Sequence, residues 1–216
     1  MEKLGHVLAR SASLAEAING LLQEVEYDGS RRGEAALGMC GIAFEHAESL
    51  RLLISEGLPT SGIAMLRLQF ESLLRAAWLW HAASDADVSK LLASLTPESQ
   101  QAAKNLPSVG EMLAEVAKKG PPGAGRLLTR FRDRLLPGLN SFVHGGIHPL
   151  RRKSDGYPES MLLNVIESSN ASSLMTVLVL AAIASDPDIL AGLNELNQEF
   201  GDCVPPPEPF PESERL

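Results

Sequence analysis

Apolar residues recur every three or four positions along most of this chain, and this spacing limits the possible folds more than any other feature. In the stretch "AMLRLQFESLLRAAWLWHAA", leucine and aromatic side chains repeat with the period of an α-helix. Runs in which β-branched and polar residues alternate, as they do in strands, hardly occur. Aromatic residues make up only 5% of the chain, so the core must consist mostly of Leu, Ala, Ile and Val, which suits helix packing. The sequence therefore predicts an all-α protein.

Interruptions in this spacing divide the chain into long and short helices. Long helices are expected over about 3–25, 30–56, 60–83 and 158–185. Short helices are expected over about 86–95, between Pro97 and Pro107, from a Ser108 cap to a Gly120 stop, from about 124 onward, and over about 187–200. Pro137-Gly138 predicts a kink or a restart, because proline removes a backbone donor and clashes with the preceding turn. The stretch "IHPLRRKSDGYP" is expected to be a loop.

These elements fit one domain. The 216 residues are enough for a single all-α helical bundle over 1–200, with about four long helices and short helices inserted between the third and the fourth. Residues 201–216 form a Pro/Glu-rich tail that we expect to be disordered or polyproline-like.

No feature of the sequence points to a membrane or to secretion. The longest apolar run, 174–184, is shorter than the roughly 20 residues that span a bilayer, so it indicates a buried core helix. The first residues lack the continuous apolar stretch of a signal peptide. Cys40 and Cys203 show no paired spacing, which is typical of reduced thiols. We therefore expect a cytoplasmic protein without a membrane partner.

Positive charge is concentrated in the segment 118–153. The whole chain carries a formal charge of -8, yet this segment holds nine basic residues and one acid, so it carries +8 and the remainder carries -16. The basic residues are Lys118, Lys119, Arg126, Arg130, Arg132, Arg134, Arg151, Arg152 and Lys153. Such a patch can attract an anionic partner despite the net charge. The alternative is an ordinary solvated helix face that acidic helices balance.

The stretch "LNSFVHGG", residues 139–146, contains the first candidate site. Asn140 and His144 lie four residues apart, which places them on one side of a helix that the two glycines would end. A histidine in the last helical turn beside basic residues has the properties of a general acid or base. Gly145 and Gly146 would let a ligand or another backbone come close. The alternative is that Asn140 and His144 are buried polar groups satisfied by neighbouring helices.

The same stretch resembles the second motif of the HEPN superfamily of small all-α proteins. That motif is Arg, four to six residues, then His, often with a polar residue directly after the Arg. "LNSFVH" matches the polar residue at Asn140 and the histidine at His144, but position 139 is Leu where the motif has Arg. Arg134 lies ten residues before His144, which in one straight helix is about 15 Å along the axis.

The resemblance implies an activity and a set of roles. Members of this superfamily are commonly metal-independent ribonucleases of toxin–antitoxin or phage-defence systems, and they often act as homodimers with the site between protomers. His144 would then be the acid or base and Asn140 would orient the phosphate or the imidazole. The phosphate-binding residues would be Arg134, Arg151, Arg152 and Lys153. The partners would be RNA, a second copy and a protein such as an antitoxin, without a cofactor.

A second candidate site lies in the third long helix. Arg67, Glu71 and Arg75 are spaced four apart, so they share one face and can form a ladder of ion pairs. This ladder could line a polar pocket that faces Asn140 and His144. The alternative is a surface network of salt bridges that contributes little.

Other site chemistries lack support. The chain has no HExxH, no Glu-x-x-His pair of the di-iron type, no phosphate-binding loop and no nucleophile elbow, so we expect no metal site. Three functions stay open: a ribonuclease, a non-catalytic binding or regulatory module, and a protein-interaction bundle whose acidic tail docks elsewhere. The missing Arg favours the second of these, and the local charge of +8 favours an anionic ligand under the first two.

Overall fold

The computed structural model describes residues 2–206, and these residues form ten α-helices and one short 3-10 helix. The long helices are α1 (Glu2–Leu22), α2 (Arg31–Ser55), α3 (Pro59–His81), α7 (Ala124–Val143) and α9 (Glu159–Ala184). The shorter ones are α4 (Asp85–Leu91), α5 (Pro97–Ala103), α6 (Val109–Lys119), α8 (Ile147–Asp155), α10 (Pro187–Glu199) and the 3-10 helix Gly201–Cys203. Within the described part no strand occurs, so the predicted all-α class is confirmed.

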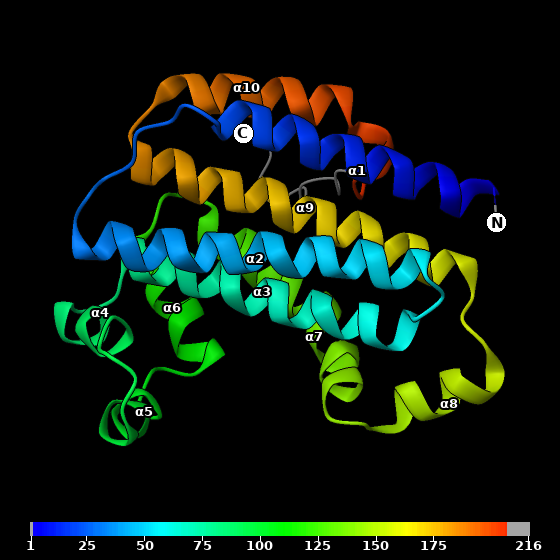
Figure 1. Ribbon diagram of the computed structural model, residues 1–216, viewed down its shortest axis with the longest axis horizontal. Coiled ribbons are helices and arrows are strands. Elements are labelled where there is room, and N and C mark those ends of the chain that lie inside the picture. The colour runs from blue at the N-terminus through cyan, green and yellow to red at the C-terminus, as the bar shows by residue number, and fades with distance from the viewer. Residues whose placement is uncertain (1, 207–216) are drawn as a thin grey trace, which may run out of the picture.

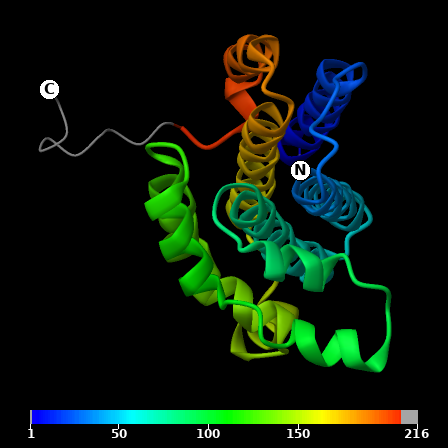
Figure 2. The same ribbon diagram turned by 90° about the vertical axis from the view of Figure 1, so that its left-hand side faces the viewer.

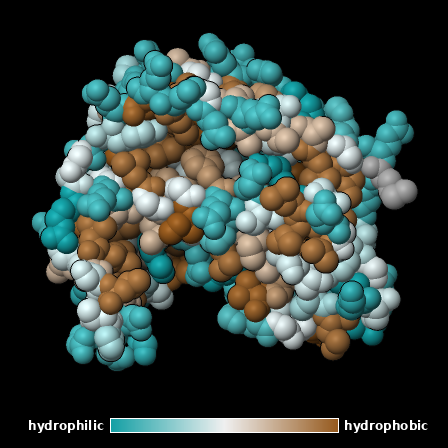
Figure 3. Space-filling model, in the orientation of Figure 1, coloured by the Kyte–Doolittle hydropathy of each residue, from teal (hydrophilic) through white to brown (hydrophobic). Residues whose placement is uncertain are grey.

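The helices lie in layers around α9. The helices α2 and α3 form an antiparallel hairpin that packs against one side of α9, and α1 and α10 pack against its other side. The helices α6 and α7 lie on the far side of α3, as Figure 1 and the turned view in Figure 2 show. The helices α4–α5 and α7–α8 project from this body, and Figure 3 shows a hollow in the surface between the two projections.

Apolar side chains form two connected cores. One core lies among α2, α3, α6 and α7, where Trp78 is 1% exposed and Phe70 stacks on Phe131 with ring centroids 4.8 Å apart. The other lies among α1, α9 and α10 and the C-terminal part of α7. The helix α3 contributes to both cores. Buried side chains on the other sides of α3 therefore fix the position of its face toward α7, which carries the side chains discussed below.

Several predicted helix boundaries are confirmed. Ser108 caps α6 by accepting a hydrogen bond from the backbone of Glu111, whose carboxylate in turn accepts from the backbone of Ser108. Gly120 ends the same helix. The short helix expected over about 86–95 is observed as α4, and Ser84 caps it by accepting from the Asp87 backbone N–H.

Of the kink or restart expected at Pro137, the restart is wrong, because α7 continues through it as one helix of 20 residues. Proline removes the hydrogen bond to the carbonyl of Asp133. Both residues lie on the exposed side of α7, so that carbonyl can be hydrated. This continuity explains why the structure has five helices of 20 residues or more where the sequence predicted about four.

The expected loop after "HGG" is also wrong, because residues 147–155 form α8. Pro149 lies in the first turn of α8, where backbone N–H groups have no partner within the helix, so the proline does not disrupt it.

Residues 201–203, which the sequence placed in a disordered tail, form the 3-10 helix. Cys203 is buried, and Asp202 binds Arg10 of α1 at 3.0 Å. The folded domain therefore extends beyond 200. The rest of the predicted tail from 207 onward lies outside the described residues.

Candidate functional site

The face of α3 that looks toward α7 carries the predicted ladder. Arg67 Nη1 lies 2.8 Å from Glu71 Oε1, and the two side chains are 14% and 33% exposed. Arg67 Nε donates a hydrogen bond of 2.8 Å to Asn140 Oδ1 of α7. The structure thus brings together three residues that the sequence singled out in two separate segments. The pairing is possible because α3 and α7 pack side by side along the Phe70–Phe131 stack.

Arg75 lies two turns further along the same face of α3. Its Nε atom is buried, and no described residue accepts a hydrogen bond from it. A buried N–H group without an acceptor costs about 1–3 kcal/mol. The guanidinium is thus ready to donate to a water molecule or to an oxygen of an anionic ligand.

His144 ends α7 as its C-terminal cap, and its backbone N–H bonds to the Asn140 carbonyl at 3.1 Å. Both side chains are exposed, so the interpretation of Asn140 and His144 as buried polar groups is wrong. No described side chain hydrogen-bonds to the His144 imidazole.

The two glycines build the corner between α7 and α8. Gly145 has a φ of 65°, and the Gly146 N–H bonds to the Ser141 carbonyl at 2.8 Å, which is the Schellman arrangement. The Ser141 hydroxyl accepts from the His148 backbone N–H at 3.0 Å and so caps the first turn of α8. A Cβ on Gly146 would lie 2.5 Å from the Ser141 hydroxyl oxygen. The close approach that these glycines permit is therefore one between two helices of the same chain.

The predicted phosphate-binding residues do not form one cluster. Arg134 is six residues before Asn140 in a continuous helix, so it points about 120° away around the axis. Its charge acts on Glu167 of α9. Burial raises the pKa of Glu167, and the positive charges of Lys3 and Arg134 oppose that rise. Arg134 therefore belongs to a different face of α7 from Asn140.

The other three predicted phosphate-binding residues lie on α8, directly after the corner. Arg151 is 67% exposed and pairs with Asp155 at 3.2 Å. Arg152 lies near the Gly156 carbonyl, with Nη1 and the oxygen 3.5 Å apart. Lys153 is exposed in the last turn. The helix α8 contacts both α3 and α7, so these cations flank the α3–α7 site.

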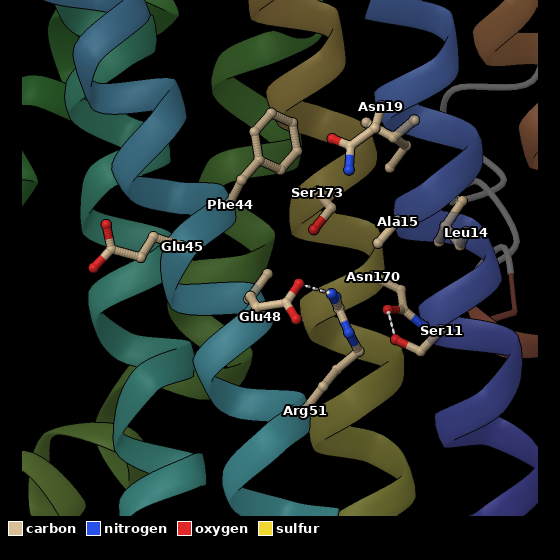
Figure 4. A pocket seen from close by; sticks show the side chains of 12 residues that line it. Ser11, Leu14, Ala15, Asn19, Phe44, Glu45, Glu48, Arg51, Asn170 and Ser173 are labelled. Atoms are coloured by element: carbon tan, nitrogen blue, oxygen red, sulfur yellow. Dashed lines mark hydrogen bonds and ion pairs between the residues drawn. The ribbon is translucent and has the colours of Figure 1, made fainter.

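A polar pocket elsewhere in the molecule was not predicted from the sequence. It has a volume of about 230 Å³ and lies between α1, α2 and α9 (Figure 4). The Ser11 hydroxyl and Asn170 Oδ1 form a hydrogen bond on one side of it, and Asn170 Nδ2 donates 2.7 Å to the Cys203 carbonyl. Arg51 pairs with Glu48 at 2.6 Å on the other side, and burial lowers the pKa of Arg51.

The stretch "ESSNASS", 167–173, could have revealed this pocket. It places polar residues in the middle of the most apolar helix, where five of them are buried, namely Ser168, Ser169, Asn170, Ser172 and Ser173. Thr176 of the same helix is buried as well. Buried polar groups need partners, and here Gln69 exchanges hydrogen bonds with Ser169 while the hydroxyls of Ser172 and Ser173 bond back to their own helix. We therefore assign these groups to helix packing.

Among residues 2–206, no group of three or more His, Cys, Asp or Glu side chains could hold a metal ion. The helix α9 is long and apolar enough to cross a membrane, but 72% of its most apolar window is buried inside the protein, as in a core helix.

A family model described as "Family of unknown function (DUF6988)" matches residues 40–206, which run from within α2 through the 3-10 helix. The match includes the α3–α7 site and leaves out α1. No curated protein and no solved structure matches the chain.

Proposed function

The chain belongs to the family of unknown function DUF6988, and we propose from the α3–α7 site that it is a metal-independent ribonuclease. The proposal follows the resemblance of "LNSFVH" to the HEPN motif and places the protein in a toxin–antitoxin or phage-defence system. The observation that carries it is the hydrogen bond of 2.8 Å between Arg67 Nε and Asn140 Oδ1. This bond puts a guanidinium one helical turn from His144.

The position of Arg67 bears on the residue that the motif lacks. Leu139 is 5% exposed and belongs to the core, so an arginine at that position of this helix could not reach a ligand without moving. Arg67 reaches the adjacent Asn140 from α3 instead. A guanidinium recognises phosphate oxygens through several N–H groups in a fixed plane, and this holds whichever helix supplies it. Glu71 neutralises part of its charge, so Arg75 and the cations of α8 must supply the rest.

The chemistry would use the exposed imidazole. Neutral His144 would take the proton of an RNA 2′-hydroxyl as that oxygen attacks the adjacent phosphorus. The bond from phosphorus to the 5′-oxygen would break, and the proton would return to this leaving oxygen. The products would be a 2′,3′-cyclic phosphate and a free 5′-hydroxyl. Asn140 would orient the phosphate while Arg151, Arg152 and Lys153 hold the neighbouring phosphates.

The test is cleavage of mixed RNA in the presence of a chelator. We expect wild type to cleave, and His144→Ala to lose about 100-fold or more, the usual contribution of a general acid or base. The control is His6→Ala, which removes another exposed histidine, on α1. Arg67→Ala should lower cleavage as well. If wild type leaves all substrates intact, or if His144→Ala cleaves as well as wild type, the catalytic proposal is wrong.

One observation favours a second candidate, a non-catalytic RNA-binding or regulatory module. A general base is usually held by a further hydrogen bond, and no described side chain provides one to His144. Under this alternative the chain binds RNA without cleaving it, and replacing Lys153 should reduce the salt slope of binding by about 1. Filter binding across a salt series measures that slope, and the cleavage assay with the chelator separates the two candidates.

A homodimer is part of both candidates. Three apolar side chains are exposed at the corner between α7 and α8, namely Val143 at 38%, Ile147 at 68% and Leu150 at 72%. A second copy that covered them would lie next to His144. Sedimentation of wild type and Leu150→Glu tests this, and a variant that dimerises as wild type does would place the interface elsewhere. A protein partner such as an antitoxin would be sought by co-purification.

A further inference from the structure

An apolar groove runs between α3, α7, α9 and α10. Its volume is about 1040 Å³. Three partly exposed leucines from three helices line it, namely Leu127, which is 48% exposed, Leu178, which is 41% exposed, and Leu190, which is 46% exposed. Arg126 and Arg130 of α7 also line it. The Asn140–His144 segment and the polar pocket of Figure 4 take no part in this groove. A groove of this size with exposed leucines indicates a surface that another segment covers.

The folded chain ends on the side of the molecule where α7 lies. The Cys203 carbonyl accepts from Asn170 of α9 at 2.7 Å. One turn earlier in α9, Glu167 lies within electrostatic range of both the Cys203 thiol and the Arg134 guanidinium. Figure 2 shows the chain leaving the 3-10 helix on the side of the molecule where α6 and α7 lie. The described chain therefore ends on the same side of the molecule as α7, which carries Arg134.

A row of arginines leads from this point to the groove. Arg134, Arg130 and Arg126 are four residues apart, so they lie on one face of α7. Arg134 is near Glu167, whereas Arg126 and Arg130 line the groove together with Val179 and Leu178 of α9. The two helices are therefore antiparallel, and the row runs about 12 Å from Arg134 to Arg126.

We propose that residues 207–216 of the same chain, "PEPFPESERL", occupy this groove and thereby cover its leucines. Three acids and one base give the segment a net charge of -2, which complements the arginine row. With its prolines the segment favours a polyproline helix of about 3.1 Å per residue, so Glu208 and Glu212 are about 12 Å apart. That separation matches the distance from Arg134 to Arg126. Phe210, midway between the two acids, then faces the leucines.

The length of the segment is sufficient. Ten residues in this conformation extend about 31 Å. From Asn170 to Leu178 along α9 is only about 12 Å, and the groove begins within that distance. A second copy or an unrelated partner could also supply an apolar, acidic peptide, but this segment is covalently joined to residue 206 and needs no second molecule.

A cysteine cross-linking experiment on the full chain tests the proposal. The test variant combines Ser213→Cys in the segment with Thr129→Cys in the groove. The control combines Ser213→Cys with Ser55→Cys, which lies at the other end of the α2–α3 hairpin, near the start of α3. Burial raises the pKa of Cys40 to about 12 and that of Cys203 to about 11, so the native thiols react slowly.

We expect the test variant to form a cross-link within one chain at least about tenfold faster than the control, because docking raises the effective concentration of the two thiols. Adding Glu208→Lys and Glu212→Lys should remove the difference, as should high salt. Equal rates in the test and control variants would overturn the proposal. A cross-linked dimer that forms in proportion to protein concentration would also overturn it and assign the groove to a second copy.

A second readout does not depend on the engineered thiols. In the full chain, Phe210→Ala should expose the groove and raise the fluorescence of a dye that binds apolar surfaces, while the circular dichroism stays unchanged. Ser213→Ala serves as the control in the same segment. Equal dye binding by Phe210→Ala and Ser213→Ala would contradict the assignment of Phe210 to the groove.

Discussion

Replacing Asn170 with alanine should destabilise the protein strongly. Asn170 is 2% exposed; its side chain accepts from the Ser11 hydroxyl and donates to the Cys203 carbonyl, and both of these residues are fully buried. Alanine would leave two buried polar groups without partners. At about 1–3 kcal/mol for each, the free energy of unfolding should fall by about 2–6 kcal/mol. The adjoining polar pocket could admit a water molecule, which would bring the loss toward the lower figure.

Urea unfolding followed by circular dichroism measures this loss. The matched control is Asn164→Ala, an exposed asparagine of the same helix, which should change stability by no more than about 0.5 kcal/mol. Because Asn170 also holds the 3-10 helix in place, the Cys203 thiol should react faster in Asn170→Ala while Cys40 stays protected. A loss below about 1 kcal/mol would refute the reasoning that the two hydrogen bonds hold this segment to the core.

Three further changes test the packing and the buried groups. Gly125→Ala should destabilise the protein by about 1–3 kcal/mol, because the new methyl group would lie 2.5 Å from the α6 backbone. Gly138→Ala in the same helix has open space around the new methyl group and should stabilise by about 0.5–1 kcal/mol. Thermal unfolding compares the two variants. Burial lowers the pKa of His81 from 6.5, so as the pH falls the unfolded chain binds this proton before the folded chain does, and the free energy of unfolding should fall below about pH 6.5. His81→Gln should flatten this fall. An unchanged dependence of the free energy of unfolding on pH in this variant would contradict the assignment to His81. Cys40 and Cys203 should react with iodoacetamide at pH 8 far more slowly in the native than in the denatured protein, since burial raises both pKa values.

The helix boundaries that the sequence predicted correctly depend on local interactions. Ser108 and Glu111 satisfy each other's backbone groups within one turn, so the cap of α6 can be read without knowledge of the fold. The predictions at Pro137 and Pro149 were wrong because the effect of a proline depends on its surroundings. Pro137 leaves a carbonyl unpaired on an exposed face, and Pro149 occupies a first turn that needs no donor.

In the candidate site, too, the sequence predicted local features but not the contacts between helices. The sequence placed Arg67 and Glu71 on one helical face and Asn140 and His144 on another, because a spacing of four is a property of any α-helix. It could not show that Arg67 bonds to Asn140, which lies 73 residues away. It also grouped Arg134 with the site, although a continuous α7 turns that side chain toward α9.

The sequence by itself thus determined the all-α class, most helix spans and the faces on which charged and apolar residues lie. These features follow from short-range periodicity, capping and side-chain size. Only the tertiary structure decided which faces meet, that Asn170 joins α1 to the C-terminal segment, and that an apolar groove opens between α7 and α9. The physical reason is that apolar burial has no direction, so the same amphipathic helices could pack in several ways, and only the close fit of particular side chains selects one.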